Sequence, residues 1–140
     1  MFNLNDNLKN KKFLIYGYGK SGFSVHNYLK KYNKILIYDD NKKPNKFYTS
    51  IKKIKITKFD YIVLSPGIDI NQCKLKNYLK INRSKIITDL DIFYLNNQKN
   101  LKISITGTNG KSTTAKLLFE ILKDQKKDVI LAGNIGIPIL

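Results

Sequence analysis

The chain has 140 residues, with a hydrophobic fraction of 42% and a charged fraction of 26%; these fractions are typical of a globular protein and exclude a disordered one. The formal net charge is +16, yet Arg83 is the only arginine among the 26 basic residues. Because nucleic-acid readers favour clustered arginine, and the lysines here are scattered along the chain, no specific nucleic-acid partner is expected. A single cysteine and a single histidine, Cys73 and His26, exclude an internal disulfide and a Cys/His zinc cluster.

The first part of the chain alternates short apolar runs with amphipathic or polar segments, a pattern that predicts an α/β fold. Expected strands are residues 13–16, 34–38, 51–56, 61–64 and 85–88. Expected helices are residues 21–32, 71–81 and 90–95, and residues 41–50 are expected to form a loop. Residues 1–95 are therefore predicted to form a Rossmann-like domain with a parallel sheet.

A polar linker, residues 96–100, separates this domain from a second unit that begins at Leu101. There the pattern predicts a strand at 101–105, a helix at 111–125 and a second strand at 129–132. The apolar stripe of that helix is expected to be buried and consists of Ala115, Leu118, Phe119 and Leu122. Residues 101–140 are thus predicted to be the opening βαβ of an incomplete P-loop ATPase domain, less stable than the first domain because apolar strand faces lack cover.

A glycine-rich loop joins the expected strand 101–105 to the expected helix. It reads Gly107-Thr108-Asn109-Gly110-Lys111-Ser112-Thr113. Glycines permit a tight turn, and the exposed N–H groups at the start of the following helix face an anion. Lys111 is suited to the β- and γ-phosphates, and the Ser112 hydroxyl to Mg²⁺. The loop is a shorter variant of the Walker A pattern, in which Ile105 stands where the strict pattern has a glycine, and it predicts ATP binding.

A second glycine-rich turn follows the expected strand 13–16. Its glycines have the G-x-G-x-x-G spacing and are Gly17, Gly19 and Gly22. Asp39 follows about 20 residues later, as in dinucleotide-binding domains. Lys20 and Ser21 add polar groups to the turn, and Asp40 doubles the acid. An NAD-type domain would explain this turn alone, whereas a ligase that couples ATP to a nucleotide-bearing substrate uses both loops.

Together these motifs resemble the Mur ligases of peptidoglycan synthesis, and among them the members that add D-glutamate. The segments that carry the resemblance are residues 17–22, 65–68, 107–113 and 133–136. Family members have a uridine-nucleotide domain, a central ATPase domain and a C-terminal domain that receives the amino acid. The chain is therefore expected to be the N-terminal piece of a longer ligase and to have no ligase activity alone.

The resemblance implies ATP-dependent amide formation with Mg²⁺. The carboxylate of UDP-N-acetylmuramoyl-L-alanine would attack the γ-phosphate of ATP, and the amine of D-glutamate would displace phosphate from the acyl phosphate. The expected molecule is a monomer. The polar N-terminus without a signal-peptide core, and the absence of an apolar run of about 18 residues, predict a cytoplasmic protein with no membrane partner.

The resemblance also implies which residues act. The UDP-sugar contacts would be Lys20, Ser21, Asp39, Asp40, Ser65, Pro66, Gly67 and Asn134. Asp39 and Asp40 would lie beside the uracil, and Asn134 would reach the sugar–lactyl region. Residues 107–113 would hold ATP, with Lys111 and Ser112 as the catalytic residues and Ser112 as the Mg²⁺ ligand.

One position departs from the family pattern. Relatives often carry arginine two residues after the position of Asp39; here Asn41 stands there, and Lys42 is the candidate replacement for its charge.

A nucleotide-sugar-binding module without catalysis and an NAD-type Rossmann protein remain alternatives. A folylpolyglutamate-type ligase would share the phosphate loop without the first glycine turn, and a basic nucleic-acid ATPase predicts clustered arginine and aromatic residues.

Overall fold

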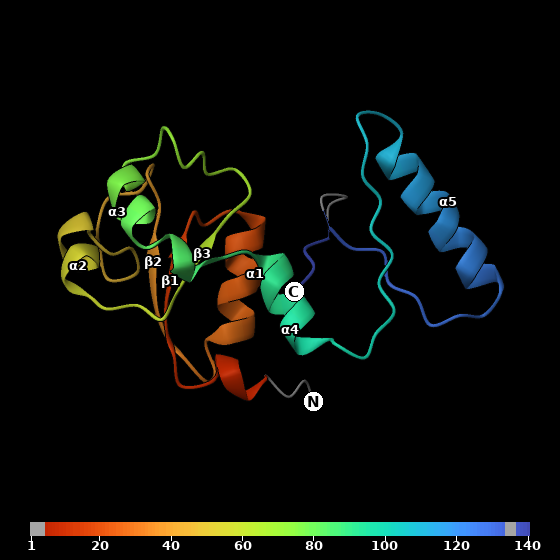
Figure 1. Ribbon diagram of the computed structural model, residues 1–140, viewed down its shortest axis with the longest axis horizontal. Helices are drawn as coiled ribbons and strands as arrows, with labels where there is room; N and C mark the ends of the chain where they lie inside the picture. Colours follow the sequence, from red (N-terminus) through yellow and green to blue (C-terminus); the bar gives the residue numbers. More distant parts are fainter. Residues whose placement is uncertain (1–4, 134–136) are drawn as a thin grey trace. The chain divides into compact units, whose positions relative to one another are not determined.

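The computed structural model describes residues 5–133 and 137–140. The chain forms two compact units, Met1–Gln98 together with Leu140, and Lys99–Ile139. The first unit contains the sheet and most of the helices, and the second contains one long helix (Figure 1). Among the described residues, no helix has both the length and the apolar character needed to cross a lipid bilayer.

A parallel sheet forms the centre of the first unit, with the strand order β2-β1-β3-β4. The strands are β1 (Lys12–Tyr16), β2 (Lys34–Tyr38), β3 (Tyr61–Leu64) and β4 (Ile86–Ile87). In β1, Leu14 lies opposite Leu36 of β2 and Ile62 of β3. Four of the five residues of β1 are buried, as expected of a central parallel strand that is covered on both faces.

Helices cover both faces of this sheet (Figure 1). They are α1 (Lys20–Leu29), α2 (Ile51–Ile56), α3 (Lys76–Ile81) and α4 (Asp89–Asn96), with short 3₁₀ turns at Asp6–Leu8 and Arg83–Lys85. Because successive strand residues point to opposite faces, Ile15 packs in a core cluster with α1 and α4, while Leu14 packs with α2 and α3. The predicted α/β domain with a parallel sheet is confirmed.

The order of the strands locates the point where the chain changes direction. It passes through α1 from β1 to β2 on one side, and then through α2 to β3 on the other side of β1. At such a switch point the connections leave the two strand ends in opposite directions, which opens a crevice at their carboxyl ends. In this sheet the crevice lies where β1 and β3 end.

Several predicted elements of the first unit need correction. The strand expected at 51–56 is wrong, because these residues form α2. The spacing of Ile51 and Ile54 fits one helical face, Ile54 is buried, and the Ser50 side chain accepts a hydrogen bond from the N–H of Lys53 at 3.2 Å. The helix expected at 71–81 begins only at Lys76, and the strand expected at 85–88 shrinks to Ile86–Ile87.

In the second unit, α5 (Lys111–Asp124) confirms the expected helix, but both expected strands are wrong. Residues 101–105 and 129–132 form no strand, so the predicted βαβ is absent from the described residues. Leu101 is 91% exposed and Ile130 is 85% exposed. A parallel strand is stable when both of its faces are covered, and the single helix of this unit cannot provide that cover.

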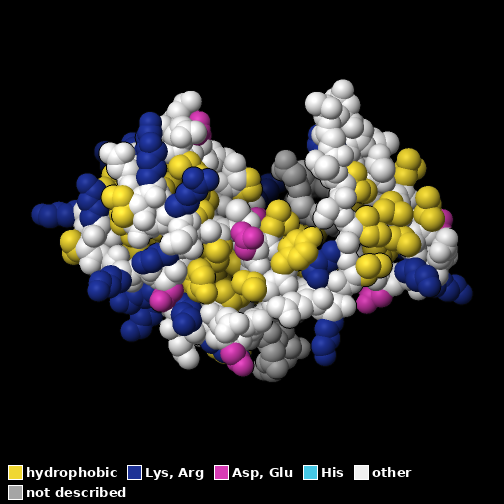
Figure 2. Space-filling view, in the orientation of Figure 1, with side chains coloured by type: hydrophobic (Ala, Val, Ile, Leu, Met, Phe, Trp, Pro, Cys, Tyr) yellow, Lys and Arg dark blue, Asp and Glu magenta, His cyan; other side chains and the backbone are white. Residues whose placement is uncertain are grey.

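The apolar stripe of α5 is half-buried rather than buried. Its neighbours Leu117 and Ile121 are 61% and 53% exposed, and apolar side chains gather on this helix in Figure 2. Among the described residues of 99–139, none is buried. The second unit therefore has no hydrophobic core of the kind that the first unit has.

Candidate functional site

Three of the predicted site segments of the first unit meet at the carboxyl edge of the sheet. Gly17 follows β1, Ser65 follows β3 and Asp39 follows β2. Since the edge between β1 and β3 is the switch point, it is the part of a doubly wound sheet at which ligands bind. The structure thus brings together segments that lie far apart in the sequence.

The glycine turn is packed so tightly that two of its glycines are sterically required. Gly17 has a φ of 89°, and a Cβ there would lie 2.9 Å from the Ser65 Cβ. A Cβ on Gly22 would lie 2.1 Å from the Gly17 carbonyl oxygen, whereas a Cβ on Gly19 would meet no atom within 4 Å. The turn therefore presses the start of α1 against the end of β1.

The N-terminus of α1 is open to an anion. Gly19 is its N-cap and provides no side-chain hydrogen bond, so the first N–H groups of the helix are available to a phosphate. Lys20 is exposed and Ser21 is half-buried in this first turn. These two predicted contacts are therefore placed where a diphosphate would meet the helix dipole.

Ser65 joins the loops that follow β1 and β3. Its hydroxyl donates a hydrogen bond to the Gly17 carbonyl oxygen at 2.8 Å, and its N–H donates to the Tyr16 carbonyl oxygen at 3.0 Å. Pro66 and Gly67 are exposed beyond it. The Ser65 hydroxyl thus ties the loop after β3 to the loop after β1, and the exposed turn lies beyond it.

The paired aspartates divide into two different roles. The Asp39 carboxylate accepts hydrogen bonds from the N–H groups of Tyr18 and Asn41, both at 2.9 Å. The Asp40 carboxylate instead accepts a hydrogen bond from the Tyr16 hydroxyl at 2.7 Å. Asp39 therefore holds the glycine turn, and Asp40 is directed toward the core cluster that contains Tyr16.

The surroundings of Asp40 change the pKa values of two neighbouring phenols. Burial first, and then the hydrogen bond to Asp40, raise the pKa of Tyr16 above its ordinary value of 10.0, and the same causes raise the pKa of Tyr38. Both phenols are therefore protonated at neutral pH and can donate. The second carboxylate oxygen of Asp40, Oδ1, is buried without a hydrogen-bond partner among the described residues.

Lys74 is a residue that the sequence did not indicate. Its ammonium donates a hydrogen bond to the Asp40 carbonyl oxygen at 2.7 Å and so lies beside the turn that contains Asn41, where the family resemblance implies an arginine. Lys42, the candidate replacement, is exposed. No local motif marks Lys74, because it follows Asp40 by 34 residues and only the sheet topology brings it near.

A cluster of aromatic rings beside the glycine turn was also not predicted. It consists of Tyr18, Phe23, His26, Phe47 and Tyr48, and is called the aromatic cluster below. The Phe47 ring lies 5.0 Å from the Tyr18 ring and 5.0 Å from the Tyr48 ring, measured between centroids. The Tyr18 hydroxyl lies 2.7 Å from His26 Nδ1, so the histidine has a place in the packing rather than an isolated surface position.

The proton affinity of His26 provides a test of this packing. Burial, and secondarily the charge of Lys30, lower the pKa of His26 below its ordinary value of 6.5. A lowered pKa means that the folded state favours the neutral ring, so the free energy of unfolding should fall as the pH drops below about 6.5. Because this is the only histidine in the chain, its ring protons can be followed without overlap in an NMR titration.

The expected result is a midpoint below 6.5 in the native chain. In His26→Gln, the loss of stability between pH 7 and pH 5 should shrink, since the neutral amide cannot take up the proton. A midpoint at or above 6.5 would contradict the buried position of the ring.

In the second unit, a glycine-rich turn leads into α5 at residues 107–110. Gly107 and Gly110 have φ values of 154° and 75°, a region that favours glycine, and Gly110 is the N-cap of α5. The Lys111 ammonium contacts the Gly107 carbonyl oxygen and donates to that of Thr108 at 3.0 Å. Two carbonyl oxygens of the loop therefore accept hydrogen bonds from the loop's own lysine.

The loop residues are open to solvent. All seven residues of 107–113 are exposed, so their N–H groups and the Ser112 hydroxyl can be reached from solvent. Within the part of the chain that the structure describes, no group of three or more His, Cys, Asp or Glu side chains could hold a metal. Ser112 remains the predicted Mg²⁺ contact of this chain, and the predicted contact Asn134 lies outside the described residues.

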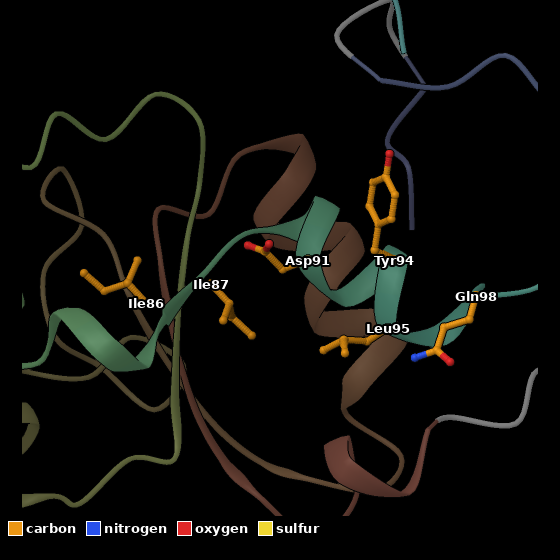
Figure 3. A pocket seen from close by; sticks show the side chains of 6 residues that line it. All are labelled: Ile86, Ile87, Asp91, Tyr94, Leu95 and Gln98. Atoms are coloured by element: carbon orange, nitrogen blue, oxygen red, sulfur yellow. The ribbon is translucent and has the colours of Figure 1, made fainter. Parts of the chain in front are cut away.

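One further surface feature contains none of the predicted site residues. A shallow hollow of about 480 Å³ lies between β4 and α4, lined by Ile86, Ile87, Asp91, Tyr94, Leu95 and Gln98 (Figure 3). Lysines are scattered over the face of the first unit seen in Figure 2, with no single basic patch there. The glycine turns thus remain the best-supported site.

A doubly wound sheet with a glycine turn at its switch point, followed by a glycine-rich loop that opens a helix, is an arrangement typical of nucleotide-binding α/β proteins. No family model matches the sequence. A UDP-N-acetylmuramoylalanine–D-glutamate ligase of Wolbachia sp. subsp. Brugia malayi is 39% identical over 146 residues, which cover 94% of this chain and 29% of the relative.

Ligases of the same name give similar figures in other bacteria. That of Rickettsia prowazekii is 38% identical over 94% of the chain, and that of Francisella tularensis subsp. tularensis is 37% identical over 99% of it; each match covers 32% of the relative. The chain therefore belongs to the Mur ligase family, as its motifs predict, and it spans about a third of the length of these relatives.

Proposed function

We propose that this chain is the substrate- and ATP-binding part of a ligase that adds D-glutamate to UDP-N-acetylmuramoyl-L-alanine in peptidoglycan precursor synthesis. The observation that carries the proposal is the glycine turn at the β1/β3 switch point, joined to Ser65 by a 2.8 Å hydrogen bond. The first unit binds the uridine nucleotide there, and the second unit holds ATP on residues 107–113. The similarity to ligases named for this reaction supports the assignment.

The strand order argues against the NAD-type alternative. In the dinucleotide-binding order 3-2-1-4, the third strand lies outside the second, and a second mononucleotide half follows. Here β3 lies beside β1, so the first unit offers one mononucleotide half. A nucleoside diphosphate attached to a sugar suits such a half better than a dinucleotide does.

Each proposed site residue has a physical role in this proposal. Backbone N–H groups at the start of α1, with Lys20 and Ser21, bind the diphosphate, and Asp39 keeps the turn in place. When bound, ATP with Mg²⁺ supplies the phosphoryl group that activates the substrate carboxylate. Lys111 neutralises the phosphates as a point charge, and Ser112 offers its hydroxyl to Mg²⁺.

We further propose that the protein is a monomer and lies in the cytoplasm. Cys73 is a free thiol, which suits a reducing compartment. The role proposed for Asn134 is contact with the sugar–lactyl part of the substrate.

Isothermal titration with UDP-N-acetylmuramoyl-L-alanine, and with NAD as the control ligand, tests the proposal. We expect the uridine nucleotide to bind and NAD not to bind. Binding of NAD alone would overturn the proposal in favour of a dinucleotide-binding protein. Absence of heat with both ligands would contradict the assignment of the site to the first unit.

A further inference from the structure

The aromatic cluster is built around the glycine turn itself. Tyr18 stands between Gly17 and Gly19, and its ring contacts those of Phe23 at 6.1 Å, Phe47 at 5.0 Å and Tyr48 at 6.1 Å between centroids. These rings come from three segments: the turn after β1, the helix α1 and the loop after β2. The cluster therefore lies beside the glycine turn of the proposed site.

Two rings of this cluster face solvent. Phe23 is 55% exposed and Phe47 is 46% exposed, although each packs against the ring of Tyr18. Together they present aromatic surface beside the polar turn. Such surface gains free energy when a planar partner covers it.

The loop that carries Phe47 is held firmly against β2. The Asn45 side-chain oxygen accepts hydrogen bonds from the N–H groups of Phe47 and Tyr48 at 2.7 and 2.8 Å. Further along, the Thr49 N–H donates to the Ile37 carbonyl oxygen of β2 at 2.7 Å. The Phe47 ring is thus presented on a fixed backbone, which limits the entropy lost when a ligand stacks on it.

The position of the ring relative to the sheet indicates which part of a nucleotide it would meet. In doubly wound sheets the phosphates lie at the N-terminus of the first helix, and the nucleoside extends toward the acid at the end of the second strand. That acid is Asp39, whose Oδ2 accepts a hydrogen bond from the Tyr18 N–H at 2.9 Å. Tyr18, the residue that binds this acid through its backbone, also carries the ring against which Phe47 packs at 5.0 Å between centroids.

We propose that the aromatic cluster is a stacking wall for the pyrimidine base of the bound uridine nucleotide, with Phe47 as its exposed platform. The inference rests on the proposed function, because it assigns the base of the same ligand. It adds a specificity element that the glycine turn and the aspartates do not provide. Hydrogen bonds to the base edge read its identity, while the wall requires the base to be planar and aromatic.

Comparison of UDP with 5,6-dihydro-UDP isolates the stacking contribution. The two ligands share their diphosphate and ribose, but the reduced base is neither aromatic nor flat. In isothermal titration we expect the native chain to bind UDP about tenfold more tightly than dihydro-UDP, the usual size of a base–aromatic stack. Phe47→Leu should weaken UDP binding about tenfold and leave dihydro-UDP binding unchanged, so that the preference disappears.

Two variants serve as controls. Tyr94→Leu removes a ring that is also 46% exposed but belongs to α4, and it should leave both affinities unchanged. Phe47→Tyr keeps the platform and should keep the preference for UDP. In ligand NMR, the uracil H6 resonance should move upfield on binding to the native chain and to Phe47→Tyr, and much less with Phe47→Leu.

Each outcome is decisive. If UDP and dihydro-UDP bind equally to the native chain, or if Phe47→Leu keeps the preference, the stacking wall is wrong while the proposed uridine site stands. If UDP and UDP-N-acetylmuramoyl-L-alanine both fail to bind, the proposed function fails and the inference fails with it. Should Phe47→Leu not fold, the comparison of the two ligands on the native chain and Phe47→Tyr still decides.

Discussion

Gly22→Ala is expected to destabilise the first unit by about 3 kcal/mol, at the upper end for overpacking, and to abolish uridine-nucleotide binding. The added methyl group would lie 2.1 Å from the Gly17 carbonyl oxygen and 3.2 Å from the Ser65 Oγ. Since the first contact is with backbone, relief requires that α1 move away from the turn. Alanine otherwise favours a helix over glycine by about 1 kcal/mol, so a net loss identifies the clash.

Urea unfolding followed by tyrosine fluorescence measures this effect in the full chain. All nine tyrosines lie between Tyr16 and Tyr94, so the signal reports the first unit alone. Gly19→Ala is the matched control, because its Cβ would meet nothing within 4 Å and its φ of −81° suits any residue. Because alanine is a poorer N-cap residue than glycine, we expect the control to lose less than about 1 kcal/mol of stability, well below the loss in Gly22→Ala. A Gly22→Ala variant as stable as the native chain would contradict the packing of α1 on the turn.

The parts of the fold that the sequence predicted correctly are those set by local pattern. The mainly apolar runs at 13–16, 34–38 and 61–64 are short and rich in β-branched and aromatic residues, a pattern that favours buried strands, and each forms one. The strand predicted at 51–56 was wrong because the six residues, Ile-Lys-Lys-Ile-Lys-Ile, are too few to separate the helical from the strand period. The strands at 101–105 and 129–132 failed for a different reason: strand formation depends on partners and cover, which local pattern does not report.

The candidate site likewise contains features that the sequence predicted and features that it did not. Both glycine turns are contiguous in sequence, so their spacing alone predicted them. The hydrogen bond from Ser65 to Gly17, the position of Lys74 and the aromatic cluster join residues that meet only once β1 pairs with β2 and β3. The pair of aspartates could likewise be recognised as a motif. The sequence did not show that one carboxylate binds the glycine turn and the other binds a tyrosine of the core.

Amide hydrogen exchange is expected to separate the two units by at least about five hundredfold in protection. In the first unit, the slowest amides should be those of β1 and β3, where Ile15 and Val63 are 0% and 2% exposed, and should exchange only by global unfolding, which costs at least about 5 kcal/mol in a typical domain. In residues 101–132 no side chain is buried. An isolated helix of the length of α5, 14 residues, is marginal in water, so its amides should be protected less than about tenfold.

Exchange measured by NMR on the 140-residue chain gives both values in one sample, with α1 as the internal control for a helix of similar kind. The buried face of α1, at Val25 and Leu29, should give its amides strong protection, whereas those of α5 around Phe119 should exchange early. The difference then reflects burial and not helix propensity, because both are amphipathic helices. Equal protection in the two helices would mean that residues 99–139 contain a core that their exposure does not show, and that the phosphate loop is held by packing rather than by its own hydrogen bonds.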